Sequence, residues 1–160
     1  MSIAKYIDHT ILKPGTTLSE IQKVCNEAKE YSFAAVCIPP YFVSTASTFL
    51  KNSDIKIATV IGFPFGYNNY EAKFKEAEIA AKDGANELDM VMNIAAFKNG
   101  DYNYIKEEVQ TILQVVNKTN IVLKVIIETG LLSGEEIIEC CDLYKNYPVN
   151  FLKHQDNRQE

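Results

Sequence analysis

The sequence predicts an α/β fold in which short strands and amphipathic helices alternate along the chain. Apolar, β-branched runs such as FAAVCI (33–38) and IKIATVIGF (55–63) are typical of buried parallel strands. Longer stretches with the apolar spacing of helices separate these runs. About six strand–helix units follow one another without a linker or a break in composition, so one domain over residues 1–160 is expected. Such repetition forms either an open doubly wound sheet or a (β/α) barrel.

The expected elements follow in a regular order. A short strand near YIDHT precedes a helix over 17–31, which begins with Thr17 as N-cap and Glu20 in a capping box. The Pro39-Pro40 pair ends the next strand, because proline cannot donate to a strand ladder. The remaining helices are expected at 43–50, 70–82, 102–116 and 134–144, and the remaining strands at 86–93, 120–129 and 149–153.

Polar residues at the expected carboxyl ends of the strands favour the barrel. The turn GFPFG (62–66) lacks the GxGxxG spacing of a dinucleotide site, which argues against an open sheet that binds a nucleotide. In a barrel, the carboxyl ends of all strands meet in one crater, where active sites lie. The polar residues at these ends are Asp8, Asp89, Asn93, Lys124, Glu128 and Lys153.

Composition and charge exclude several classes of partner. The net charge is -5, and the 16 Lys and Arg residues are scattered among acids. The sequence therefore indicates no basic patch that would bind nucleic acid or an anionic membrane. The N-terminal residues lack the pattern of a signal peptide, and no run approaches the ~18 apolar residues of a membrane span. The 4 cysteines form no CxxC pattern and histidine occurs only 2 times, so a zinc site is not expected. Reduced thiols in a cytoplasmic enzyme are the expectation.

Lys124 lies inside an otherwise apolar strand. The period of two puts Lys124, Ile126 and Glu128 on one face of that strand. Because a buried cation is costly unless it is paired, two interpretations stay open. Lys124 is either the structural ion-pair partner of Glu128 or Asp89, or an active-site lysine whose pKa is tuned by burial and neighbours.

Lys153 ends the last expected strand, at the crater. A lysine amine that is desolvated beside another ammonium is neutral at moderate pH and can attack an aldehyde to form a Schiff base. The alternative is a solubilising lysine at a fraying end. Asp89 is a candidate to move protons among a carbinolamine, water and an enamine, or a counter-ion of Lys124. Asp8 and Thr10 are expected to complete the polar floor.

The chain contains, in this order, the segments IDHTILKP, FAAVCIPPYFV, TVIGFPFG, ELDMVMNIAAFKNGDY, KVIIETGLL and NFLK. Together they cover nearly everything from Tyr6 to Lys153 and resemble the deoxyribose-phosphate aldolase family. The resemblance implies a TIM (β/α)8-barrel fold and a class I aldolase, a lyase that needs neither metal nor organic cofactor. It implies reversible cleavage of 2-deoxy-D-ribose 5-phosphate to acetaldehyde and D-glyceraldehyde 3-phosphate, in deoxyribonucleotide catabolism.

The resemblance also implies a role for single residues. Lys153 matches the family's Schiff-base lysine. Asp89, the second acid of ELD, matches the family's proton-relay aspartate. The substrate pocket would be lined by Asp8, Thr10, Cys37 and Lys124. Another Schiff-base aldolase on the same barrel would keep this chemistry and change the sugar.

The chain departs from the family's pattern after Lys153. The family continues there with Thr-Ser-Thr-Gly and two more βα units, whereas residues 154–160 read HQDNRQE, a polar tail. Residues 1–153 are therefore expected to form an incomplete barrel of about six units, with weak activity. The family's second lysine and its phosphate-binding loops lie on the last two units. Open edges predict self-association, and the alternative function is a non-catalytic, self-associating form of the fold.

Overall fold

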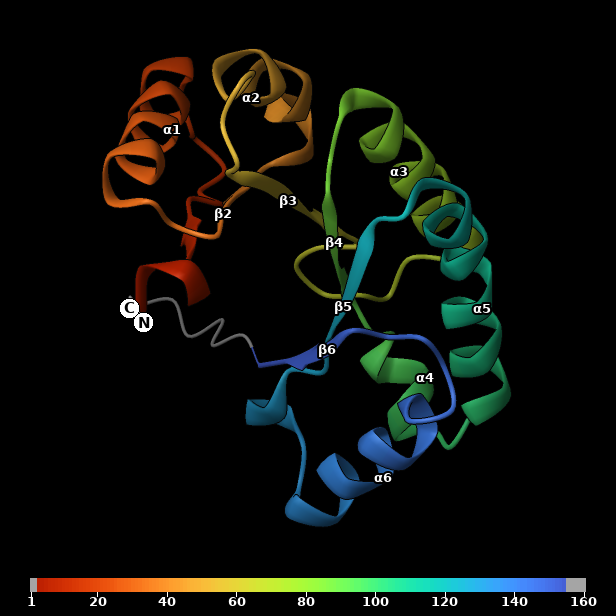
Figure 1. Cartoon of the computed structure of the whole chain (residues 1–160). Helices are drawn as coiled ribbons and strands as arrows, with labels where there is room; N and C mark the ends of the chain where they lie inside the picture. The colour runs from red at the N-terminus through yellow and green to blue at the C-terminus, as the bar shows by residue number, and fades with distance from the viewer. Residues whose placement is uncertain (1–2, 155–160) are drawn as a thin grey trace.

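The structure is a computed structural model that describes residues 3–154. One parallel sheet of 6 strands, in the order β1-β2-β3-β4-β5-β6, forms its centre. The strands curl around a common axis, and the helices lie on the outside of the curl (Figure 1). This arrangement confirms the predicted α/β fold and the incomplete barrel. The strands are β1 (Asp8–Thr10), β2 (Ala35–Ile38), β3 (Lys56–Ile61), β4 (Glu87–Val91), β5 (Val122–Ile126) and β6 (Phe151–Lys153).

Helices connect successive strands and cover the convex face of the sheet (Figure 1). The α-helices are α1 (Leu18–Tyr31), α2 (Val43–Phe49), α3 (Tyr70–Asp83), α4 (Ile94–Lys98), α5 (Tyr102–Thr119) and α6 (Gly134–Tyr144). Short 3-10 turns are η1 (Ile3–Tyr6), η2 (Pro40–Phe42) and η3 (Thr129–Leu131). Helix α4 and the 3-10 turns were not predicted, because segments this short carry less than two turns of apolar periodicity.

Side-chain caps fix where two of the helices begin. Thr17 accepts a hydrogen bond from the backbone N–H of Glu20, whose carboxylate accepts one from the N–H of Thr17. This is the predicted capping box, and Ser133 and Glu136 form a second one at the start of α6. Each box satisfies backbone donors that the first turn of a helix leaves without a partner.

Two strands end earlier than their apolar runs indicated. Strand β3 stops at Ile61 because Gly62 adopts a left-handed backbone with φ of 65°. Strand β5 stops at Ile126, and Glu128 is left-handed with φ of 49°. A residue with positive φ cannot continue a strand, so β3 and β5 each end before the last residue of the apolar run.

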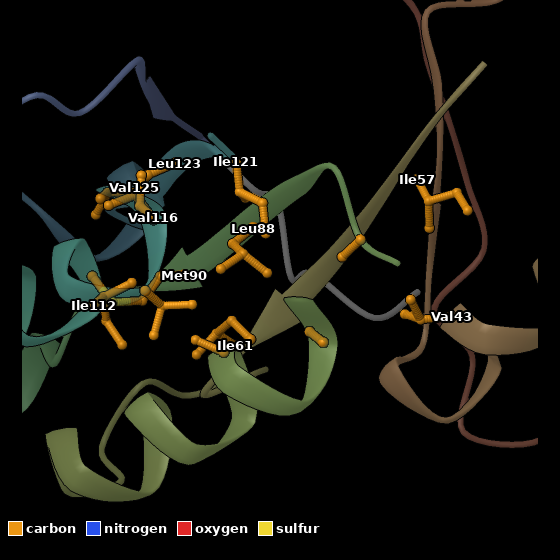
Figure 2. Close-up of a cluster of buried hydrophobic side chains, with 14 of the residues drawn as sticks. Val43, Ile57, Ile61, Leu88, Met90, Ile112, Val116, Ile121, Leu123 and Val125 are labelled. Atoms are coloured by element: carbon orange, nitrogen blue, oxygen red, sulfur yellow. The ribbon is translucent and has the colours of Figure 1, made fainter. Parts of the chain in front are cut away.

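The main core lies between the convex face of the sheet and the helices. Figure 2 shows Leu88 and Met90 of β4 packed toward Ile112 and Val116, which belong to α5. The concave face carries a separate, smaller cluster of Ala35, Cys37, Ala58 and Val60. These side chains are small, so the concave face has room for the long polar side chains described below. Larger apolar side chains at these positions would fill that space.

Among residues 3–154, no helix is long and apolar enough to cross a membrane. The polar tail expected at 154–160 lies outside the described residues except for His154, which is exposed.

Candidate active site

An amine and a carboxylate meet on the concave face of the sheet. The Nζ atom of Lys153, on β6, donates a hydrogen bond to Asp89 Oδ2, on β4, over 2.6 Å. The Lys153 side chain is 31% exposed, whereas that of Asp89 is 1% exposed. The amine is therefore open to a small molecule from the concave side, while its carboxylate partner is held in the protein. Asp8 Oδ2 lies 3.7 Å from the same nitrogen.

Lys124 occupies the centre of the polar cluster. Its Nζ atom lies 2.8 Å from Asp8 Oδ2, 2.5 Å from Glu87 Oε2 and 3.2 Å from Asp89 Oδ1. Burial lowers the pKa of Lys124, but the charge of Asp89 and the hydrogen bonds to Asp8 and Glu87 outweigh it and raise the pKa above its usual value. Lys124 is thus an ammonium at neutral pH, and it holds three carboxylates in place.

The register of the sheet explains why these residues meet. Asp89 is paired with Lys124 across β4 and β5, and Ile126 is paired with Lys153 across β5 and β6. Lys124 and Ile126 point to the same face because alternate residues of a strand do so. The curl of the sheet then brings Asp8 of β1 across to Lys124, which is 116 residues away in sequence.

Two further residues of the expected pocket lie at its border. Cys37 is buried on the concave face, with its Sγ atom 4.0 Å from Asp89 Oδ2. Burial, together with the charge of Asp89, raises the pKa of the Cys37 thiol to about 12, so this sulfur is not a nucleophile at neutral pH. Thr10 is exposed, and its hydroxyl donates to the backbone carbonyl of Asp8.

Two of the polar residues expected in the crater have other positions. Glu128 was predicted on the face of Lys124, but it lies beyond the end of β5 and lines a neighbouring cavity. The left-handed backbone at this residue breaks the alternation on which the prediction depended. Asn93 is the N-cap of α4, where its side chain accepts a hydrogen bond from the N–H of Ala96.

Sequence reasoning missed two parts of this region. Glu87 is the first acid of ELD, and the period of two already placed it on the face of Asp89. A cavity of about 740 Å³, lined in part by His154, which follows Lys153 in sequence, was not predicted either. Pro64, Phe65 and Tyr67 line it, and the rings of Phe65 and Tyr67 are stacked at 5.3 Å. The cavity depends on a loop conformation that no local pattern specifies.

The described part of the chain contains no group of three or more His, Cys, Asp or Glu side chains arranged to hold a metal ion. The chemical groups that the concave face does present are an accessible amine, a buried carboxylate beside it and an ammonium behind them. One oxygen of this carboxylate, Asp89 Oδ1, accepts no hydrogen bond from any described residue and lies in ion-pair contact with Lys124. The arrangement can bind a carbonyl compound covalently and move a proton next to it.

Known proteins share both the sequence and the fold. A deoxyribose-phosphate aldolase of Thermoanaerobacter sp. is 53% identical over 154 residues, which is 96% of this chain and 69% of the relative. One of Caldanaerobacter subterraneus is 51% identical over 96% of this chain and 67% of the relative. Among solved structures, the deoxyribose phosphate aldolase of Aeropyrum pernix superposes with a TM-score of 0.88 at 27% identity. That match covers 96% of this chain and 64% of the other, so the chain spans about two thirds of its relatives' length.

The curled parallel sheet and these relatives define the class of protein as a barrel-type aldolase. The model of the DeoC/LacD family aldolases matches residues 2–142, and this chain belongs to that family. The curated relatives, which are 53% and 51% identical in sequence to this chain, are named deoxyribose-phosphate aldolase, which is an enzyme. The alternative of a non-catalytic form of the fold is therefore not favoured.

Proposed function

We propose that the chain carries the Schiff-base centre of a deoxyribose-phosphate aldolase, a lyase that acts without a metal or an organic cofactor. The observation that supports this proposal best is the 2.6 Å contact between the Lys153 amine and the Asp89 carboxylate. A general acid or base must lie within hydrogen-bond reach of the proton that it moves. Asp89 lies at that distance from the Lys153 nitrogen, which would become the imine nitrogen. The substrate follows from the relatives, which are named for deoxyribose phosphate.

The proposed reaction begins with the neutral amine of Lys153. It adds to the C1 aldehyde carbon of open-chain 2-deoxyribose 5-phosphate to give a carbinolamine. A proton from solvent, which the final hydrolysis returns, converts the carbinolamine hydroxyl into water, and loss of this water leaves a protonated imine. Loss of the C3 hydroxyl proton to Asp89 lets the C2–C3 bond break. The electron pair of that bond moves into the imine and forms an enamine, and glyceraldehyde 3-phosphate leaves. Asp89 returns the proton to C2, and water hydrolyses the imine to acetaldehyde and free Lys153.

The neighbours of this pair have supporting roles in the proposal. The Lys124 ammonium attracts the Asp89 carboxylate and holds it in place, because the two buried groups lie 3.2 Å apart. Asp8 bridges the two lysines, at 2.8 Å from Lys124 and 3.7 Å from Lys153. The network therefore fixes the Asp89 oxygen that faces the amine. Fixed dipoles and charges of this kind reduce the reorganisation needed when the imine forms.

Reductive trapping tests the proposal. The purified chain is incubated with acetaldehyde and cyanoborohydride, which convert an imine into a stable ethylamine, and a peptide map locates the ethyl group. We expect one dominant adduct on Lys153 and its loss in Lys153→Met. The exposed Lys145 serves as a matched control, since Lys145→Met should leave the adduct unchanged. Even labelling of surface lysines, or no labelling, would refute the proposal.

Self-association and a cytoplasmic location belong to the same proposal. Strands β1 and β6 are the sheet edges within the described residues, and Phe151 on β6 is 61% exposed. Open edges with apolar side chains pair readily with another copy. The Aeropyrum pernix relative is described as tetrameric. Light scattering during gel filtration tests this part, and a monodisperse monomer at high concentration would contradict it.

The cytoplasmic location is supported by the cysteines. Free Cys25, Cys37, Cys140 and Cys141 fit a reducing compartment.

A further inference from the structure

A fully buried ion pair lies outside the proposed active site, between α3 and α5, which pack side by side (Figure 1). Lys73 and Glu108 are both 0% exposed, and Lys73 Nζ lies 2.5 Å from Glu108 Oε1. Burial lowers the pKa of Lys73 and raises that of Glu108, and each group's charge opposes the effect on the other. Removing water from two charges is expensive, and apolar residues of similar volume are often as stable. Helix packing alone therefore does not account for the pair.

The remaining bonds of the pair reach two separate backbone segments. Lys73 Nζ also donates to the carbonyl of Gly66, over 2.5 Å, and to the carbonyl of Val91, over 2.8 Å. Glu108 Oε2 accepts from the backbone N–H of Asn93 over 3.1 Å. An ammonium has three donors, and here each has a different acceptor. The pair thus joins the loop after β3 to the carboxyl end of β4.

The joined segments are in such close contact that the loop has little freedom. Gly66 has φ of 71°, and a Cβ atom there would overlap the carbonyl oxygen of Met92. A Cβ atom on Gly62 would lie 2.6 Å from Lys73 Cε. The N–H of Gly62 donates to Glu76 Oε2 over 2.7 Å, which adds a second attachment to α3. The glycines allow the close approach, and the Lys73 ammonium holds it.

Both segments bear on the proposed active site. The loop 62–67 supplies Pro64, Phe65 and Tyr67 to the wall of the 740 Å³ cavity, and His154, next to Lys153, lines the same cavity. Val91, whose carbonyl Lys73 binds, lies two residues after Asp89 on the same strand. A shift of β4 at this end would therefore move the Asp89 carboxylate relative to the Lys153 amine.

We infer that the Lys73–Glu108 pair is a positioning device, which fastens the loop 62–67 to the end of β4 and so sets the cavity wall and the place of Asp89. Its effect on catalysis rests on the proposed function, whereas its effect on the loop does not. Lys73 and Glu108 touch no substrate in this proposal. They act through Gly66, Val91 and Asn93.

The test replaces the pair by apolar side chains together, in the double variant Lys73→Met/Glu108→Leu, so that no buried charge is left alone. Hydrogen–deuterium exchange then reports single segments. We expect the amides of Gly62 and Gly66 to exchange at least about tenfold faster, with the amides of β5 unchanged. The matched control is Lys75→Met/Glu78→Leu, which removes an exposed pair from the same helix. Equal loop protection in both variants, or a uniform loss over the whole sheet, would overturn the inference.

A second readout addresses the active site. In the Lys73→Met/Glu108→Leu variant we expect slower trapping of acetaldehyde on Lys153, with urea unfolding close to that of the parent chain. Faster loop exchange with unchanged trapping would overturn the part of the inference that concerns Asp89. If the parent chain itself forms no adduct on Lys153, the proposed function fails, and the exchange result still decides whether the pair anchors the loop.

Discussion

Lys153 and Asp89 are 64 residues apart in sequence, and their side chains meet at 2.6 Å across the concave face of the sheet. Strand β5 lies between them and supplies Lys124, whose ammonium lies 3.2 Å from the other oxygen of Asp89. One buried carboxylate is therefore shared by two amines of different exposure. The more exposed amine can react, and the buried one fixes the carboxylate.

The first prediction separates imine formation from proton transfer. Asp89→Asn keeps the shape of the side chain and removes the proton acceptor. We expect Lys153 to be trapped with acetaldehyde within about tenfold of the parent rate. Exchange of the acetaldehyde methyl hydrogens in D₂O, which requires the enamine, should fall by about 10²-fold or more. Proton NMR measures the exchange. Asp142→Asn, at an exposed carboxylate paired with Lys145, is the control. Full exchange in Asp89→Asn would exclude Asp89 as the relay.

The second prediction concerns the stability of the charged cluster. Lys124→Met leaves Asp8, Glu87 and Asp89 close together without the ammonium that pairs them. We expect the free energy of unfolding to fall by about 3–5 kcal/mol, because uncompensated buried charges are expensive. Urea unfolding followed by circular dichroism measures it. The control Lys145→Met breaks an exposed ion pair and should cost less than about 1 kcal/mol. Equal losses in the two variants would contradict the structure.

The third prediction is the pH dependence of that effect. The pKa of Lys124 is raised in the folded chain, so its stabilisation is fully present below the unfolded pKa of about 10.4. Between this value and the higher folded pKa, the unfolded chain loses the Lys124 proton while the folded chain keeps it, so the stabilisation falls as the pH rises and is lost as the pH passes the folded pKa. The difference in unfolding free energy between the parent chain and Lys124→Met should therefore be constant from pH 7 to about 10 and shrink above it. A difference that grows with pH would reverse the assignment.

The fourth prediction concerns the thiols. Burial raises the pKa of Cys25 to about 11 and the pKa values of Cys37 and Cys140 to about 12, whereas Cys141 is exposed. Iodoacetamide at pH 8 should modify Cys141 in the folded chain and all four cysteines in guanidinium chloride. Intact mass and a peptide map measure the labelling. Rapid labelling of folded Cys37 would show that its thiol is reactive despite its burial.

The order of the elements followed from local patterns in the sequence. Apolar runs predicted β2 to β6, helical spacing predicted every α-helix except α4, and TLSE predicted the capping box of Thr17 and Glu20. These features depend on residues within a few positions of one another, so the sequence alone determined them. The period of two also placed Asp89 on the concave face, because alternation is a property of each strand by itself.

The tertiary structure decided which charges meet. Lys124 has Asp8 as a partner because the curl of the sheet brings β1 across to β5, over 116 residues. Glu128 left the predicted face because its backbone is left-handed. Lys73 and Glu108 lie on the buried, mostly apolar faces of their helices. A charged residue at such a position predicts a buried partner, but the sequence does not show which residue that partner is. Strand alternation and helix spacing are local, whereas the pairing of buried charges depends on sheet curvature, helix packing and loop geometry, which only the folded chain establishes.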